Sequence, residues 1–276
     1  MKITVLLENT SGRNSLTARH GLSLFIETEK HRFLFDLGPD ESFLRNADIL
    51  GIDISGADLA VISHGHYDHG GGLRTFLENN AAAPVFLSSE AAGKYYSVKD
   101  GEPHYIGLDV DVLSSSQRLR FVTEKVFRID DELCLFSGVS GDAMTPQSNS
   151  NLMTFRDGSF LRDDFSHEQN LLICSAGKSV LIAGCAHCGI ENILSTCEKL
   201  TGQTPDAVIA GFHLFSNGTG FTEPEDRVEE LGRLLAGRER TLYYTGHCTG
   251  PKAFSELHRI LSDRISELHT GTVIRL

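Results

Sequence analysis

At residues 64–69 the chain reads His64-Gly65-His66-Tyr67-Asp68-His69, directly after the apolar run at 59–62. Imidazole and carboxylate are the ligands that zinc and similar divalent ions take in proteins. Residues two apart on an extended strand share a face, so His64 and His66 are predicted to bind one ion together. Asp68 and His69 follow at a glycine-rich turn and are predicted to serve a second, adjacent ion. A His-rich surface loop is the alternative, but three of the 12 His gather here.

Three further histidines repeat one pattern, in which an apolar strand and a small residue precede the imidazole. They are His187, His213 and His247. In α/β folds ligands bind where the carboxyl ends of strands meet, so these loops are predicted to converge on residues 64–69. One such His alone would more often be a hydrogen-bonded structural residue. Three repeats of the pattern favour a shared site.

Composition and charge restrict the class of protein. The chain has 276 residues, 40% of them hydrophobic and 22% charged, which is typical of a globular protein. A net charge of −12 without a basic run argues against a nucleic-acid partner. No apolar stretch reaches the about 18 residues of a membrane span. Scattered cysteines and the lack of a secretory leader predict a reduced, cytoplasmic protein, and a homo-oligomer is compatible with the sequence.

Periodicity and turn residues predict alternating strands and helices. Strands are expected at 3–8, 22–28, 32–36, 58–63, 84–87, 120–122, 133–136, 170–175, 179–183, 207–210, 241–245 and 272–276. Helices are expected at 43–50, 73–79, 89–96 and 190–200. A capping box of Thr222 and Glu225 is expected to begin another helix, and Pro251 a last one whose apolar face includes Ile265.

No linker or repeat divides the chain, so residues 1–276 are predicted to form a single domain. Residues 97–165 have weak periodicity and are predicted to form a lid or insertion, with an extended loop at 138–151. The acidic segment 163–168 contains His167 and Glu168, either of which could supply a ligand or a substrate contact. A solvated loop is the alternative there.

Asp36 and the segment 185–188 also lie near the expected site. Asp36 ends an apolar strand, which suits a carboxylate that orients a metal-bound imidazole, or else a simple turn. Cys185, His187 and Cys188 are not expected to form a structural zinc knuckle, because no second cysteine pair lies at a suitable spacing.

The His-x-His-x-Asp-His signature, the upstream Phe-Asp-Leu-Gly and the late Thr-Gly-His resemble the metallo-β-lactamase superfamily. The resemblance extends from Leu22 to Gly250. Within the superfamily the chain resembles the metal-dependent hydrolases that are similar to dihydropterin ribofuranosyl-aminobenzene phosphate synthase. The stretches that carry this resemblance are 20–23, 63–73, 184–190, 211–214 and 245–250.

The resemblance implies an α/β (α+β) fold, a four-layer αββα sandwich with a dinuclear metal site at one edge. It implies two divalent ions, with zinc as first choice and manganese or iron as alternatives. By motif, the first ion would be held by His64, His66 and His187, and the second by Asp68, His69 and His247. The usual Gly-Asp bridging motif is Gly184-Cys185 here. Cys185 or Glu168 could therefore supply the bridging ligand.

Metal-assisted hydrolysis is the predicted chemistry, because a metal lowers the pKa of its bound water to about 7. Redox di-iron members of the superfamily tend to carry Glu where this chain has His66, which favours hydrolysis. The predicted substrate is a small-molecule ester, a phosphate ester or phosphodiester above all. Asp68 and His213 are the predicted catalytic residues, and His20 and Glu168 the predicted substrate contacts. The alternatives are a transferase that joins a pterin to an aromatic amine with release of diphosphate, and a non-catalytic metal-bearing metabolite sensor.

Overall fold

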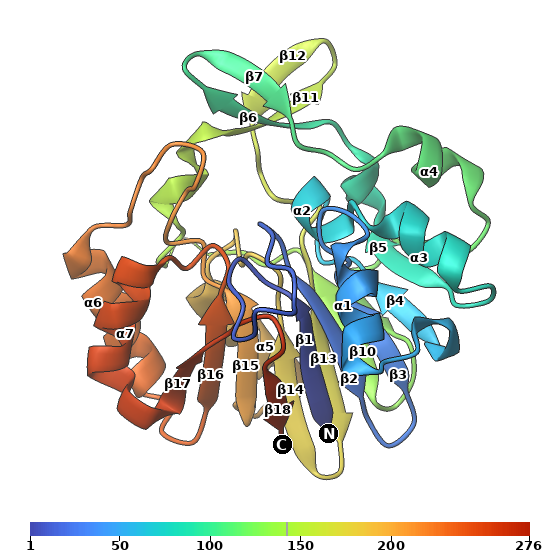
Figure 1. Ribbon diagram of the computed structural model, residues 1–276. Helices are drawn as coiled ribbons and strands as arrows, with labels where there is room; N and C mark the ends of the chain where they lie inside the picture. The colour runs from blue at the N-terminus through green and yellow to red at the C-terminus, as the bar shows by residue number, and fades with distance from the viewer. Residues whose placement is uncertain (142) are drawn as a thin grey trace.

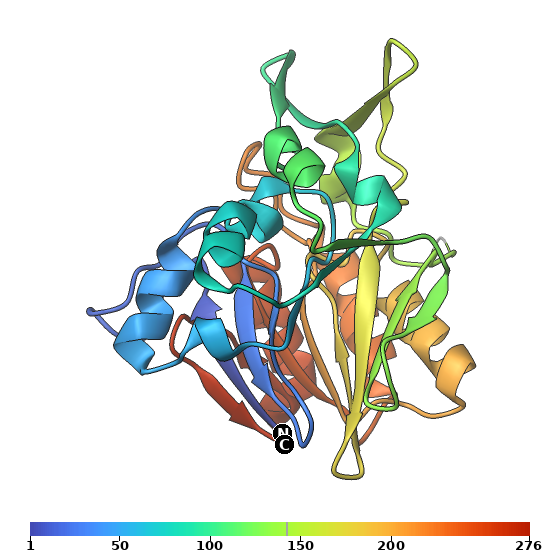
Figure 2. The same cartoon turned by 90° about the vertical axis from the view of Figure 1, so that its right-hand side faces the viewer.

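The computed structural model describes residues 1–141 and 143–276, and only the backbone of Ser115. The described strands build two seven-stranded sheets that pack face to face, with helices on both outer sides (Figure 1). Figure 2 shows the two sheets side by side. The predicted αββα sandwich is therefore confirmed.

The first sheet combines an antiparallel half and a parallel half. Strands β18, β1, β2 and β3 pair antiparallel, and β3, β4, β5 and β8 pair parallel. In spatial order its strands are β18 (Val273–Arg275), β1 (Lys2–Leu7), β2 (Ser23–Glu27), β3 (Arg32–Phe35), β4 (Leu59–Val61), β5 (Val85–Ser88) and β8 (Leu119–Val122).

The second sheet is mixed in the same way. Strands β14 to β17 run parallel, and β9, β10, β13 and β14 pair antiparallel. Its order is β17 (Ile265–Glu267), β16 (Leu242–Gly246), β15 (Ala207–Gly211), β14 (Lys178–Ile182), β13 (Gln169–Ser175), β10 (Leu133–Ser137) and β9 (Val126–Arg128). Because β14, β15 and β16 are parallel neighbours, the loops that follow them meet at one edge of the sandwich.

Side chains alternate between the two faces of each strand, and this alternation builds three apolar layers. In β14, Val180 and Ile182 lie in the cluster between the sheets, whereas Leu181 lies in the cluster under the outer helices. Burial of one such side chain contributes about 1.5–3 kcal/mol. The second sheet is covered by α5 (Ile190–Thr201), α6 (Glu225–Ala236) and α7 (Pro251–Leu261). The first is covered by α1 (Ser42–Leu50), α3 (Leu73–Asn79) and α4 (Val110–Ser115).

A four-stranded sheet stands above the edge of the sandwich, opposite the chain termini (Figure 1). Its strands, in spatial order, are β12 (Ser159–Arg162), β11 (Leu152–Arg156), β6 (Tyr95–Lys99) and β7 (Glu102–Tyr105). We call this the small sheet. It comes from the part of the chain predicted to form a lid or insertion, where the sequence predicted an extended loop at 138–151. In that loop Gln147–Asn151 forms a 3-10 turn, and Asp142 lies outside the described residues.

Three local predictions were wrong. The helix expected at 89–96 is a 3-10 turn at Ser89–Ala92, after which β6 begins at Tyr95 because its backbone pairs with β11. The capping box is absent from the described start of α6, where Pro224 is the residue before the helix and no side chain caps it. Ile265 lies in β17, since α7 ends at Leu261.

The hairpin of β2 and β3 and the helices α1, α3 and α5 lie where the sequence predicted them, within two residues at each end. Gly51 ends α1 with a left-handed φ of 69°, a conformation that favours glycine. Among the described residues, no helix combines the length and the apolar character needed to cross a membrane.

Candidate metal centre

The candidate site lies at the edge of the sandwich where strands of both sheets end. From the first sheet, β4 leads into residues 64–69, and α2 (Tyr67–Gly70) turns this segment back. From the second sheet, β14 leads to Cys185 and His187, β15 to His213 and β16 to His247. The structure therefore brings together segments up to about 180 residues apart, because parallel strands carry their following loops to the same edge.

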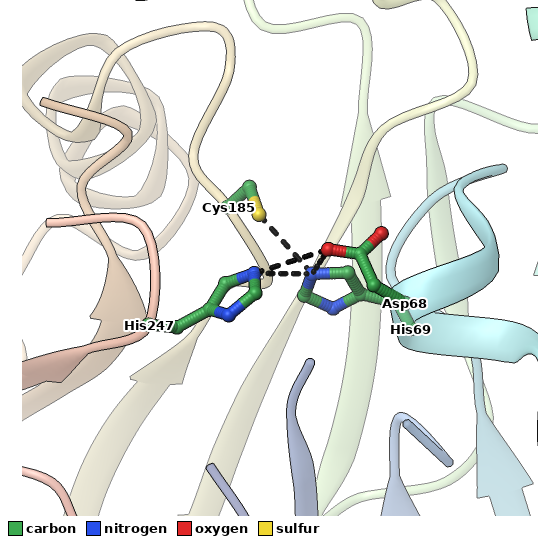
Figure 3. A group of neighbouring side chains, drawn as sticks. All are labelled: Asp68, His69, Cys185 and His247. Carbon is green, nitrogen blue, oxygen red and sulfur yellow. Dashed lines mark hydrogen bonds and ion pairs between the residues drawn. The ribbon is translucent and has the colours of Figure 1, made fainter. Parts of the chain in front are cut away.

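One group of ligand atoms consists of Asp68, His69, Cys185 and His247 (Figure 3). His69 Nε2 lies 3.1 Å from Cys185 Sγ and 3.2 Å from His247 Nε2. Asp68 Oδ2 lies 3.3 Å from His247 Nε2 and 3.7 Å from His69 Nε2. All four residues are buried. One carboxylate, two imidazoles and a thiol thus point at a single position.

A second group lies beside the first and shares Cys185 with it. The ligand atoms of His64, Cys185 and His187 lie within 4.8 Å of one another. The His66 ring centroid is 4.6 Å from that of His64 and 5.0 Å from that of His187. The Nε2 atoms of His64, His66 and His187 are buried and make no hydrogen bond. The three imidazoles lie together in one buried space, where His64 and His187 have unpartnered Nε2 atoms and His66 Nε2 lies 3.9 Å from Asp163 Oδ2.

Most of these imidazoles are held by a hydrogen bond at the ring nitrogen that points away from the ligand centre. The pairs are His69 Nδ1 with Asp36 Oδ2 at 2.6 Å, His64 Nδ1 with Ser63 Oγ at 2.8 Å, His187 Nδ1 with Asn149 Oδ1 at 2.9 Å and His247 Nδ1 with Asn9 Oδ1 at 2.9 Å. Metal-binding histidines are typically held in this way. A buried polar atom without a partner is costly, so the unpartnered Nε2 atoms of His64 and His187 fit a bound divalent cation.

The electrostatics favour the metal-binding protonation state at some of these residues and oppose it at others, since the burial of His247 is outweighed by Cys248 and Asp68, which raise its pKa to about 9. Burial and the neighbouring imidazoles lower the pKa values of His64 and His187, so both are neutral near pH 7. Burial opposes ionisation of Asp68, but His69, His247 and His20 hold its pKa well below the usual value. Burial raises the pKa of the Cys185 thiol. A bound cation would deprotonate that thiol outright.

Cys185 belongs to both groups and stands at the position where the sequence resemblance led us to expect the Asp of a Gly-Asp motif. The preceding Gly184 has to be glycine, because a Cβ there would lie 2.2 Å from Ser63 Oγ and 3.0 Å from His64 Nδ1. This close approach brings the β14 loop against the 64–69 segment. Of the two candidate bridging residues, Cys185 is the one that lies between the ligand groups.

Glu168, the other candidate, lies elsewhere. Its carboxylate accepts hydrogen bonds from the backbone N–H groups of His187 at 2.6 Å and Cys188 at 3.1 Å, and the residue is 2% exposed. The structure therefore does not bring Glu168 into the candidate site as a ligand or a substrate contact. It fixes the loop that carries His187.

Some of the strained backbone positions lie at the site. Four residues other than glycine at or beside it have left-handed φ angles of 49° to 58°, namely Asp36, Ala186, His213 and His247. Such conformations are uncommon for residues with a Cβ and cluster at functional sites, where the surrounding structure imposes them. The strain indicates that these side chains are held in place for function.

His20 and His213 face a cavity of about 260 Å³ that opens beside the ligand groups. His20 Nε2 lies 3.4 Å from Asp68 Oδ2. The His213 ring lies 4.2 Å from that of His187, and neither of its nitrogens has a hydrogen-bond partner. Ser97 and Leu152 of the small sheet line the same cavity. The two predicted substrate-side histidines therefore reach the space next to Asp68 and Cys185.

Sequence reasoning missed the residues that hold the imidazoles, apart from Asp36. Asn9 carried a weak signal, because it is a polar residue just after the buried strand β1. Asn149 comes from a loop whose spacing gives no signal. Its position depends on the small sheet and on the segments that flank it.

The comparison with known families decides the class of protein, since residues 16–247 match the metallo-beta-lactamase superfamily. The chain belongs to this superfamily. The resemblance expected from the sequence motifs is therefore confirmed, and the match covers both strands and loops that build the site.

Individual relatives are similar over the whole chain. Two proteins of Methanocaldococcus jannaschii are each 27% identical to it. The uncharacterized protein MJ0448 matches over 99% of both chains. The 7,8-dihydropterin-6-methyl-4-(beta-D-ribofuranosyl)-aminobenzene-5'-phosphate synthase matches over 100% of this chain and 96% of its own length. The crystal structure of Tm1679, a metal-dependent hydrolase of the beta-lactamase superfamily, matches with a TM-score of 0.84 and 29% identity over 100% of this chain and 99% of that one.

Proposed function

We propose that this protein is a metal-dependent hydrolase that cleaves a phosphate ester or phosphodiester of a small molecule. It would use two divalent cations, with zinc preferred over manganese or iron. The observation that carries the proposal is the set of buried ligand groups that share Cys185, of which the two that contain motif histidines are taken as the cation sites. The similarity to Tm1679 over the full chain supports the same class of reaction.

His64, His66 and His187 would hold one cation, and Asp68, His69 and His247 the other, with Cys185 between them. When bound, the two cations would supply a hydroxide nucleophile near neutral pH and a Lewis acid for the substrate oxygen. The Asp68 carboxylate is ionised and would orient the nucleophile by accepting its hydrogen bond. His213 has two unpartnered nitrogens and would pass a proton to the leaving oxygen. His20 would contact the substrate.

The charge of the site favours a phosphate. Asp68 and Cys185, the latter as a thiolate, are the only anions among the proposed ligands, so two divalent ions would leave a net positive charge. Among the described residues, the cavity is lined by no Lys or Arg. The cations would therefore be the partners of an anionic group, and Ser97 or Asn217 on the cavity wall would contact a neutral polar part of the substrate.

A substrate panel tests the proposal. Protein reconstituted with zinc or manganese should hydrolyse a nitrophenyl phosphomonoester or phosphodiester, and His66→Ala or Asp68→Ala should abolish the turnover. His258→Ala, on the exposed face of α7, is the matched control and should retain it. Full occupancy by two cations without turnover of any ester would reject the hydrolase and favour a metabolite sensor.

A second candidate is a transferase, favoured by the relative named as a synthase. In that reaction a C–O bond to diphosphate would break, and a C–N bond would form between a pterin methyl carbon and an aromatic amine, which loses a proton. With both substrates supplied, the transferase would release one diphosphate for each joined product. Release of diphosphate with formation of the pterin alcohol instead would indicate hydrolysis.

We also propose that the small sheet and its flanking loops act as a lid over the cavity. The chain would work as a single domain in the cytoplasm on small molecules, without a nucleic-acid or membrane partner. Ser97 and Leu152 at the cavity wall support the lid. Accelerated proteolysis in the 97–165 segment without substrate, and protection with it, would be the expected signature.

A further inference from the structure

Beside the His64 and His187 imidazoles lies a further buried group, which consists of His66, Asp163 and His167. Asp163 directly follows β12 of the small sheet, and His167 lies two residues before β13. The side chains of Asp163 and His167 are fully buried, and that of His66 is 5% exposed. Tyr95 of β6 packs on the His167 ring at a centroid distance of 4.0 Å. Nothing in the function proposed above uses Asp163 or His167.

The hydrogen bonds of His167 fix its tautomer. The backbone N–H of Gly65 donates to His167 Nδ1 at 2.9 Å, so Nδ1 carries the lone pair. A neutral imidazole has one lone pair and one proton on its two nitrogens, so the proton lies on Nε2. Nε2 then donates to Asp163 Oδ2 at 3.2 Å. His167 has no lone pair left for a metal, so the group of Asp163, His167 and His66 is not a third cation site.

Asp163 is held on both oxygens. Oδ2 accepts from His167, and Oδ1 accepts from the backbone N–H of Phe165 at 2.9 Å. His66 Nε2 lies 3.9 Å from Asp163 Oδ2, is buried and makes no hydrogen bond. The carboxylate is therefore the charged acceptor that this nitrogen faces.

We propose that Asp163, held by His167, positions His66 as a metal ligand. The His66 Nε2–H would point at Asp163 Oδ2, which leaves the Nδ1 lone pair of His66 for the first cation. The inference rests on the proposed function, because it requires a cation held by His64, His66 and His187. Asp163 is a positioning residue in this account, since it acts through His66.

His69 and His66 would then each be held by a carboxylate, and the two carboxylates would come from different parts of the fold. Asp36, at the end of β3, holds His69 on the side of the second cation. Asp163, at the end of the small sheet, would hold His66 on the side of the first. Loss of Asp163 should therefore lower the affinity for the cation held by His66 and leave the affinity for the other cation unchanged.

Metal titration of variants tests the inference. Zinc affinities measured by competition with a chromogenic chelator should resolve two ions in the wild-type protein. Asp163→Asn should lower the affinity for one ion by about 10- to 100-fold and leave the affinity for the other within about twofold of the wild-type value. The matched control is Asp164→Asn, the neighbouring exposed carboxylate that pairs with Arg156, and it should bind both ions like the wild type.

A rescue variant of His167 distinguishes a positioning role of this residue from a role in packing alone. In His167→Gln the side-chain amide can still accept from Gly65 and donate to Asp163, so both zinc affinities should stay near those of the wild type. His167→Ala should behave like Asp163→Asn. Unchanged affinities for both ions in Asp163→Asn would overturn the inference, whereas a wild-type protein that takes up no zinc would overturn the proposed function instead.

A spectroscopic measurement on the wild-type protein is independent of how the variants fold. Long-range ¹H–¹⁵N spectra of the zinc-loaded protein should show His167 neutral with its proton on Nε2, and His66 protonated on Nε2 with Nδ1 bound to metal. A His66 ring that binds zinc through Nε2 would contradict the inference.

Discussion

Cys185 is the residue that distinguishes this site from the Gly-Asp pattern expected at its position. Its sulfur lies within 4.8 Å of the other ligand atoms of both groups and 3.1 Å from His69 Nε2. Thiolate is a soft ligand that selects zinc, whereas carboxylate suits manganese better. The single substitution of sulfur for a carboxylate should therefore set the metal preference of the whole site.

Cys185→Asp should keep two cations but lower the ratio of zinc to manganese affinity by on the order of tenfold or more. The reason is that a hard carboxylate replaces the soft thiolate at the shared position. Competition titrations with both metals measure the ratio. Cys174→Asp changes the same residue type at an exposed position that does not line the cavity and serves as control. An unchanged ratio would mean that Cys185 is not a ligand.

The amides behind His187 and His247 give a paired prediction. Asn149→Ala removes the partner of His187 Nδ1, and Asn9→Ala removes that of His247 Nδ1. Each lost hydrogen bond should cost about 1 kcal/mol, or about fivefold in affinity, but for different ions. Each variant is thus the control for the other. The division into two ligand groups would be contradicted if both variants lowered the affinity for the same ion, or if neither variant lowered the affinity for any ion.

The sequence identified the imidazoles and Asp68 but not most of the groups that orient them. Histidines at strand ends form a repeated pattern, and this pattern can be read without a structure. Asn9, Asn149 and Asp163 reach the site only because β1, a 3-10 turn and the small sheet end there. Asp36 was predicted because it ends an apolar strand in a recognisable motif.

At the scale of elements, buried strands and helices were predictable where one face is apolar, as in α5 and β14. The small sheet was not. All residues of β7 and β12 are exposed, so these strands have no hydrophobic alternation. They become strands by pairing with β6 and β11 in hairpins whose turns are Asp100-Gly101 and Asp157-Gly158, and Asp-Gly is a local turn signal that the sequence prediction did not use. Only the pairing of β6 with β11, which joins segments more than 50 residues apart, leaves no local mark in the sequence.

The contact between α5 and the end of α6 depends on one arginine. Arg238 donates to Glu191 at 2.7 Å and to Glu198 at 2.8 Å, and its side chain is 12% exposed. Arg238→Ala should lower the free energy of unfolding by about 2 kcal/mol, because it leaves two partly buried carboxylates unpaired. Urea denaturation measures the loss.

Arg233→Ala provides the matched control for this contact. Arg233 pairs with Glu229 on the exposed face of α6, with its side chain 66% exposed, and such pairs contribute about 0–1 kcal/mol. Equal effects of Arg233→Ala and Arg238→Ala would show that the Arg238 pairs add no more than a surface ion pair.

At the scale of the whole molecule, the candidate site joins the two sheets. The loop after β4 comes from the first sheet, and Cys185, His187 and His247 come from the second. The order of the layers was predictable from the family motifs, because the motifs indicate which strands end at the site. The position of the small sheet over this edge was not, because it depends on a segment without periodicity.

Because the proposed ligands come from both sheets, bound cations should stabilise the fold against unfolding. At a free zinc concentration about 1,000 times the dissociation constant, the gain should be about 4 kcal/mol, and the melting temperature should rise on the order of 10 °C. Calorimetry in chelator and in zinc measures the difference. His64→Ala should reduce the rise and His258→Ala should not. Equal melting temperatures with and without zinc would contradict a site shared by the two sheets.

The central claim is that two cations lie on either side of Cys185, and anomalous diffraction at the zinc absorption edge tests it most directly. Crystals of the zinc-loaded protein should show two anomalous peaks about 3.5–4 Å apart. One peak should lie among His64, His66 and His187, and the other among Asp68, His69 and His247, with the Cys185 sulfur between them. A map with no peak there, or with zinc bound away from Cys185, would contradict the account.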